Sequence, residues 1–219
     1  MYWDWSTAGE FNSDGTTRVE YDSLGNITYH TQKGSFQWEN NVVPEYMWFN
    51  GDARHYLLGD QIDSTTPVQL NTLIGDYHDK NSRIIPVKVH RGKQIFDPEN
   101  KTMILPHLFG HDSAAYWNTY DWDRAAETGM KSVDLPYSGK YSFVSTEMYW
   151  PINHMVAPKE ESLDCEACHT RDSRLNDLAG FYLPGRDSNR LLDFIGFSLI
   201  ILTFLGVIIH SLLRATKEC

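Results

Sequence analysis

The chain has 219 residues and a formal net charge of −10, and it lacks a basic stripe that would neutralise the phosphates of a nucleic acid. Composition therefore argues against nucleic-acid binding. Aromatic residues make up 13% of the sequence, which suits packing around flat apolar cofactors, because Trp and Tyr bury large rings while their polar tips reach partners.

The first forty residues alternate short β-like runs with turn signals. Runs over 18–21, 27–31 and 35–38 contain β-branched and aromatic residues, and the turn sequence at 22–26 separates the first two. We predict a small hairpin or meander in this part of the chain.

The same pattern recurs over residues 83–105. Apolar β-like runs at 83–89 and 102–105 flank the turn-forming sequence Asp-Pro-Glu-Asn at 97–100. This arrangement predicts a second strand pair.

Residues 113–130 form the clearest candidate for a soluble helix. Asp112 or Ser113 is a suitable cap at its start, and Gly129 lies near the expected stop. We predict one helix over 113–130 and mostly irregular structure in the segments around it.

The pentapeptide CEACH at 165–169 matches the C-x-x-C-H pattern of covalent c-type haem attachment. The thiols of Cys165 and Cys168, three positions apart, can reach the two vinyl groups on one edge of a porphyrin, and His169 can then ligate the iron. A structural zinc site needs a second ligand pair, and the only other cysteine is Cys219. A free dithiol, the remaining alternative, is expected beside a βαβ pattern that this sequence does not display. We predict one covalent haem c.

A six-coordinate haem needs a second axial ligand, and two histidines are the best candidates by context. His90 follows a β-like run, and His154 lies eleven residues before the first haem cysteine. Met155, beside His154, is a weaker rival that is better suited to packing. We expect His90 and His154 to be distal iron ligands.

Residues 194–213 carry no formal charge and match the roughly 30 Å thickness of a bilayer core. We predict a transmembrane helix over 191–213. A buried core helix is the alternative, although soluble helices rarely stay apolar on every face for five turns.

His210 lies inside this apolar span, where an ionisable side chain must face protein, water or a cofactor. One hypothesis gives it a haem b or a quinone contact, with a membrane cytochrome b or quinone-reactive subunit as partner. The other lets it reach toward the lipid headgroups with help from Arg214.

These features divide the chain into four parts. We expect a mixed domain supplying packing and distal ligands at 1–160, a haem attachment segment and linker at 161–190, the membrane helix at 191–213 and a cytoplasmic tail at 214–219. Basic residues on the two sides of the helix are nearly balanced and decide no orientation. Because c-type haems are attached outside the bacterial cytoplasm, we expect a single pass through the inner membrane with most of the chain in the periplasm.

An exported domain should begin with a signal peptide, yet the first residues have no basic n-region and no apolar h-region. We therefore expect the chain to be the distal part of a longer protein, or to depend on another subunit for export.

Several long segments resemble the C-terminal part of the octahaem c-type cytochromes of the tetrathionate reductase family. They are YWDWSTAGEF, KGSFQWENNVVPEYMWFNG, RIIPVKVHRGKQ, LPYSGKYSFVSTEMYWPINHMVAPKE and LAGFYLPGR. The resemblance implies a periplasmic multihaem reductase whose haems pass electrons to a catalytic haem, with tetrathionate or small nitrogen compounds such as nitrite and hydroxylamine as substrates. It also implies that Cys165, Cys168 and His169 belong to a family haem motif.

The family has eight such motifs, whereas this chain has one. The resemblance therefore implies that the catalytic haem and most other haems lie in an upstream portion or a companion multihaem subunit, and that His90 and His154 ligate either this haem or a neighbouring one. Catalytic residues cannot be named, because no pair of side chains is spaced for acid–base work.

The resulting fold class is α+β with much irregular structure, short β-hairpins and few helices, plus one C-terminal transmembrane helix. The expected function is electron transfer between the quinone pool or a membrane cytochrome and a catalytic haem elsewhere, in either direction. The alternative is a self-contained, membrane-anchored monohaem carrier. A haem-based sensor is disfavoured because a six-residue tail leaves no room for an output domain.

Overall fold

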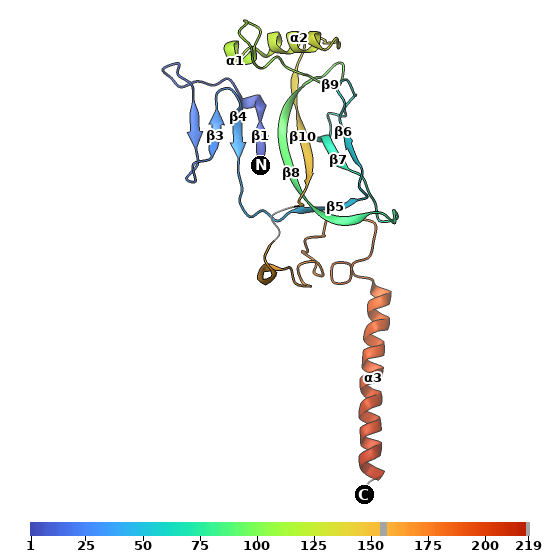
Figure 1. The fold of residues 1–219 in the computed structure, drawn as a ribbon. Coiled ribbons are helices and arrows are strands. Elements are labelled where there is room, and N and C mark those ends of the chain that lie inside the picture. Colours follow the sequence, from blue (N-terminus) through green and yellow to red (C-terminus); the bar gives the residue numbers. More distant parts are fainter. Residues whose placement is uncertain (154–156, 218–219) are drawn as a thin grey trace. The chain divides into compact units, whose positions relative to one another are not determined.

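The computed structural model describes residues 1–153 and 157–217, and contacts divide the chain into two compact units at 1–156 and 157–219. Mixed α and β structure with one long C-terminal helix is confirmed (Figure 1). The short hairpins that the sequence predicts are part of something larger, because the strands of the first unit join in one mixed sheet.

Ten strands form this sheet, in the order β2-β3-β4-β1-β8-β10-β7-β6, with β5 and β9 also paired to β8. Their bounds are β1 (Tyr2–Asp4), β2 (Val19–Tyr21), β3 (Ile27–His30), β4 (Gly34–Gln37), β5 (Glu45–Phe49), β6 (Ala53–His55), β7 (Val68–Leu73), β8 (Arg83–Asp97), β9 (Thr102–Met103) and β10 (Ser142–Pro151). The predicted meander is β2, β3 and β4, and the second predicted strand pair is β8 and β9.

Strand β8 organises the sheet. It pairs along 87–96 with β10 on one side, and with β5, β1 and β9 in turn on the other. Its Val- and Ile-rich sequence suits this position, because such side chains pack well on a pleated surface, and Val87, Ile95 and Phe96 are buried. The β1–β8 and β7–β10 pairs are parallel, whereas the other pairs are antiparallel.

The predicted helix over 113–130 is wrong in one respect, because two helices occupy the segment: α1 (Tyr116–Thr119) and α2 (Trp122–Ser132). Tyr120 between them adopts a left-handed conformation with φ 56°. The Asp121 carboxylate then accepts a hydrogen bond from the Arg124 N–H and caps a new helix start. Local capping by an Asp side chain therefore outcompetes continuation of the first helix.

Gly129 lies inside α2, not at its stop, for a packing reason. A Cβ at this position would lie 1.8 Å from the carbonyl oxygen of Leu105. The glycine therefore lets α2 approach the 105–107 backbone, and the Ala125 carbonyl of α2 accepts a hydrogen bond from the His107 N–H.

The main core cluster lies where α1 and α2 pack on the end of β8 (Figure 1). Its fully buried centre includes Tyr116, whose ring stacks on Trp122 with centroids 3.7 Å apart. The high aromatic content suggested packing around flat cofactors, but some of these aromatic residues pack on one another instead. A second buried cluster consists of Ile62, Val68, Phe96, Met103 and Val144.

The turn after β8 is built on one buried carboxylate. Asp97 is 0% exposed and its two oxygens accept five hydrogen bonds, from Glu99, Asn100 and Ser138. Burial alone would raise the pKa of Asp97, but these hydrogen bonds outweigh burial and hold the pKa below its usual range. The carboxylate links the predicted 97–100 turn to the loop that precedes β10.

The second unit contains α3 (Arg190–Lys217), and the predicted apolar helix is confirmed. It is the one helix in the described residues that is long and apolar enough to cross a membrane. None of its most apolar window is buried within the chain, which argues against the alternative of a soluble core helix. Two short 3-10 turns, at Trp5–Thr7 and Lys159–Glu161, complete the secondary structure of the described residues.

Candidate haem attachment site

The CEACH segment folds as a single helix-like turn in the second unit. The Cys165 carbonyl accepts hydrogen bonds from the N–H groups of Cys168, at 3.3 Å, and His169, at 2.9 Å. Asp164 caps the turn, because its Oδ1 accepts from the Ala167 N–H at 2.9 Å. Residues three apart on such a turn share one side, so the two cysteines are arranged for attachment to one ligand.

Both thiols are available for chemistry. Cys165 is exposed, Cys168 is half-buried, and neither forms a disulfide. A thioether to a porphyrin needs a free thiol, and both cysteines have one.

The imidazole of His169 is oriented by a second segment. Its Nδ1 lies 2.9 Å from the carbonyl oxygen of Pro184. Since a carbonyl can only accept, Nδ1 is the donor, and Nε2 is the ring nitrogen that is left to bind a metal. This is the arrangement by which proteins usually present a histidine to a metal.

Gly185 makes this approach possible. It adopts φ +91°, and a Cβ there would lie 2.0 Å from the His169 carbonyl oxygen. A side chain at this position would push the Pro184 carbonyl away from the imidazole.

The residues present therefore fit a haem c. Cys165 and Cys168 would hold the porphyrin, and Nε2 of His169 would ligate the iron. When bound, haem supplies reversible one-electron transfer, and the protein sets its ligation, burial and surroundings.

Residues 173–187, within the segment where a linker was expected, form a compact loop. Leu175, Leu178 and Leu183 are buried in it. The Arg186 side chain, only 10% exposed, lies among backbone carbonyls of this loop and pairs with Asp187. The Pro-Gly dipeptide at 184–185 is typical of a turn, but no local pattern indicates that such a turn faces His169.

Of the other predicted ligands, His90 and His210 belong to regular elements of the chain. His90 is on β8, half-buried, with its ring centroid 6.5 Å from that of Trp150. Burial, and then the positive charges of the N-terminal amine and Lys88, lowers the pKa of His90, which favours the neutral form that ligates metals. His154 lies outside the described residues, and His210 is exposed on α3.

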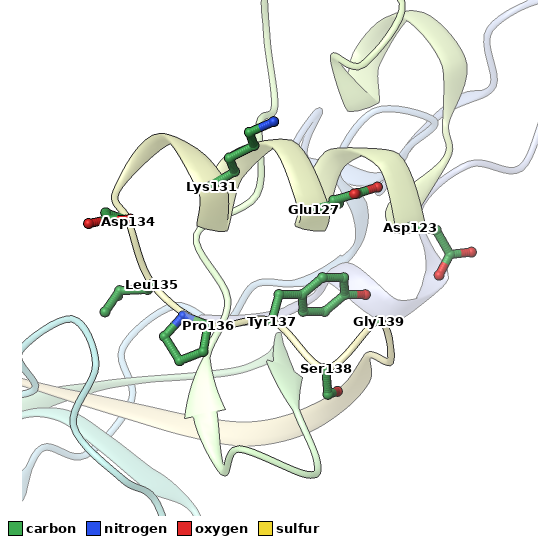
Figure 2. A pocket seen from close by; sticks show the side chains of 9 residues that line it. All are labelled: Asp123, Glu127, Lys131, Asp134, Leu135, Pro136, Tyr137, Ser138 and Gly139. Carbon is green, nitrogen blue, oxygen red and sulfur yellow. The ribbon is translucent and has the colours of Figure 1, made fainter.

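One cavity of the first unit has a different chemistry. It has a volume of about 640 Å³ and lies between α2 and the loop that follows it (Figure 2). Its polar lining comprises Asp123, Glu127, Lys131, Asp134, Tyr137 and Ser138. No predicted haem ligand lines it, and no group of three or more metal-ligating side chains occurs in residues 1–153 and 157–217.

A sequence family described as bacterial cytochrome c matches residues 1–172, which include the whole CEACH turn. The chain belongs to the bacterial cytochrome c family. Covalently bound haem c is therefore the cofactor that the family implies for this cytochrome.

The cytochrome is also similar to a solved octahaem cytochrome c from Shewanella oneidensis, with 42% identity and a TM-score of 0.71. The match covers 80% of this chain and 40% of the Shewanella chain, so the cytochrome spans about two-fifths of that protein's length. The resemblance seen in the sequence is confirmed. No curated protein matches the chain.

Proposed function

We propose that this cytochrome transfers electrons through one haem c attached to Cys165 and Cys168, with His169 as an axial ligand. The observation that carries the proposal is the CEACH turn with Nδ1 of His169 directed at the Pro184 carbonyl, which leaves Nε2 for iron. Membership of the bacterial cytochrome c family supports it.

We further propose that the chain is the membrane-anchored C-terminal portion of an octahaem reductase-like cytochrome. The 42% identity to 40% of an octahaem protein supports this assignment. The catalytic haem then lies in another portion or a companion subunit, and tetrathionate or a nitrogen compound such as nitrite is the substrate class. His90 and His154 supply distal ligands to this haem or to neighbouring haems.

The long apolar helix supports a membrane location. α3 supplies the anchor in the inner membrane, and residues 1–190 lie in the periplasm, where c-type haems are attached. Electrons pass between the catalytic haem and the quinone pool, directly or through a membrane cytochrome b. A self-contained monohaem carrier is the second candidate, favoured by the single C-x-x-C-H motif.

Haem counting on the native membrane complex tests this proposal. We expect intact mass and a pyridine haemochrome spectrum to give one covalent haem on this chain and seven on the rest of the complex, as an octahaem assembly requires. A variant ending at residue 189 should keep its haem but leave the membrane fraction. One haem with no haem-bearing partner would favour the monohaem carrier, and no haem at all would contradict both candidates.

His210→Leu tests the proposed contact with the quinone pool or a haem b. If His210 serves either role, the variant should lose quinol-dependent reduction of the c haem while dithionite still reduces it fully. Ser211→Leu, which changes the neighbouring polar residue to the same side chain, is the matched control. Unchanged quinol-linked kinetics in His210→Leu would leave the histidine with only a headgroup-facing role.

A further inference from the structure

Arg186 uses all of its hydrogen-bonding capacity inside one loop. Its Nη1 donates to the carbonyls of Leu175, at 2.7 Å, and Leu178, at 2.6 Å, and its Nη2 donates to the carbonyl of Phe181 at 2.9 Å. Nε and Nη2 also donate to Asp187, at 2.9 and 2.7 Å, in a side-on bidentate pair. The five N–H groups of a guanidinium thus have five acceptors.

The remaining contacts close the loop around this guanidinium. The Arg186 Cζ lies 5.0 Å from the centre of the Phe181 ring. Asp187 accepts a hydrogen bond from the Leu183 N–H at 2.7 Å and donates its own N–H to the Leu183 carbonyl at 2.9 Å. The ion pair raises the pKa of Arg186 and lowers that of Asp187, so both stay charged at neutral pH.

This cluster fixes the two residues that contact His169. Pro184 and Gly185 stand between Leu183 and Arg186, and both flanking residues are held by the cluster. The Pro184 carbonyl is thereby kept 2.9 Å from Nδ1 of His169. The backbone of Gly185 is held against that of His169.

We propose that Arg186, paired with Asp187, is a positioning residue that sets the orientation and basicity of the His169 ligand and thereby lowers the reduction potential of the haem. The inference rests on the proposed attachment of haem c at Cys165 and Cys168. No part of it requires Arg186 to touch the haem.

The direction of the effect follows from the hydrogen bond. Donation from Nδ1 to a carbonyl makes the imidazole a stronger electron donor, which stabilises ferric iron more than ferrous iron. A loosened loop weakens this hydrogen bond and should raise the potential. Lysine cannot replace arginine here, because its ammonium has three donors and no planar fork for a bidentate carboxylate.

The test compares Arg186→Lys with Arg171→Lys in the full membrane-bound chain. Arg171 is an exposed residue of the same unit, so its variant controls for the substitution itself. We expect both variants to carry covalent haem by intact mass. Potentiometric titration should show a shift on the order of tenfold toward the ferrous form in Arg186→Lys alone, about 59 mV for a one-electron couple.

Asp187→Asn is the second variant, and it should raise the potential in the same direction by a smaller amount. If Arg186→Lys does not accumulate with haem, the potential of Asp187→Asn decides the question. Wild-type potentials in the haem-loaded variants would overturn the inference. Loss of haem from both Arg186→Lys and Asp187→Asn would also overturn it, because the cluster would then only maintain the fold of the loop. A wild-type chain without haem would instead refute the proposed function.

Discussion

Replacing Cys165 and Cys168 together by serine is expected to abolish covalent haem binding. A serine hydroxyl does not form the thioether to a porphyrin vinyl group, and only axial ligation would remain to hold a non-covalent haem. Intact mass should fall by one haem, apart from the small change of two oxygens for two sulfurs. Haem staining of the denatured chain, which detects only covalent attachment, should be lost.

Cys219→Ser is the matched control for this result, because it removes the one cysteine outside the motif. It should keep the full haem content. Covalent haem that persists in the double variant would contradict the assignment. A wild-type chain that reacts with thiol reagents at both motif cysteines and lacks haem would favour the dithiol alternative.

Asp97→Asn is expected to lower the free energy of unfolding of the first unit by about 3 kcal/mol at pH 7. The substitution keeps the shape but places an amide NH₂ where one carboxylate oxygen accepts hydrogen bonds, so buried donors lose a charged partner. Urea unfolding of the detergent-solubilised chain, followed by Trp fluorescence, measures the loss. The exposed Asp63 forms a similar turn with Thr65, and Asp63→Asn should lower the free energy of unfolding much less, because water can replace the lost hydrogen bonds.

The difference between wild type and Asp97→Asn should depend on pH. Because the folded-state pKa of Asp97 is lowered, its contribution to stability is complete well above the unfolded pKa of about 3.9 and is lost as the pH falls through the folded value. Unfolding curves of both proteins at pH 7 and at successively lower pH should therefore converge. A constant difference over this range would mean that Asp97 stabilises the turn without its charge.

Features that depend on neighbouring residues could be predicted from the sequence. The CEACH spacing implies that two thiols and an imidazole lie on one turn, and the folded segment has this form. The 97–100 turn and the apolar span of α3 were likewise evident, because turn residues and uninterrupted hydrophobicity act over a few neighbouring positions.

Pairings between residues that are far apart in the sequence could not be predicted. The runs that form β10 and β8 are separated by α1 and α2, and no short-range pattern indicates that they lie side by side. The interruption at Tyr120 was missed because Asp121 has two roles open to it, as an exposed helical residue or as a cap. The Arg186 cluster was missed because three of its acceptors are backbone carbonyls, which no pattern of side chains in the sequence reveals.

The interior position of β1 in the sheet sets a constraint on the order of folding. Tyr2–Asp4 lies between β4 and β8, and its parallel partners on β8 are residues 91–93. The β8 edge of Tyr2–Asp4 can therefore be paired only after about ninety further residues have been synthesised. Closing such long loops slows folding, and during that interval the β1 edge is open to pairing with other chains. Chaperone protection during biosynthesis would be most valuable at this segment.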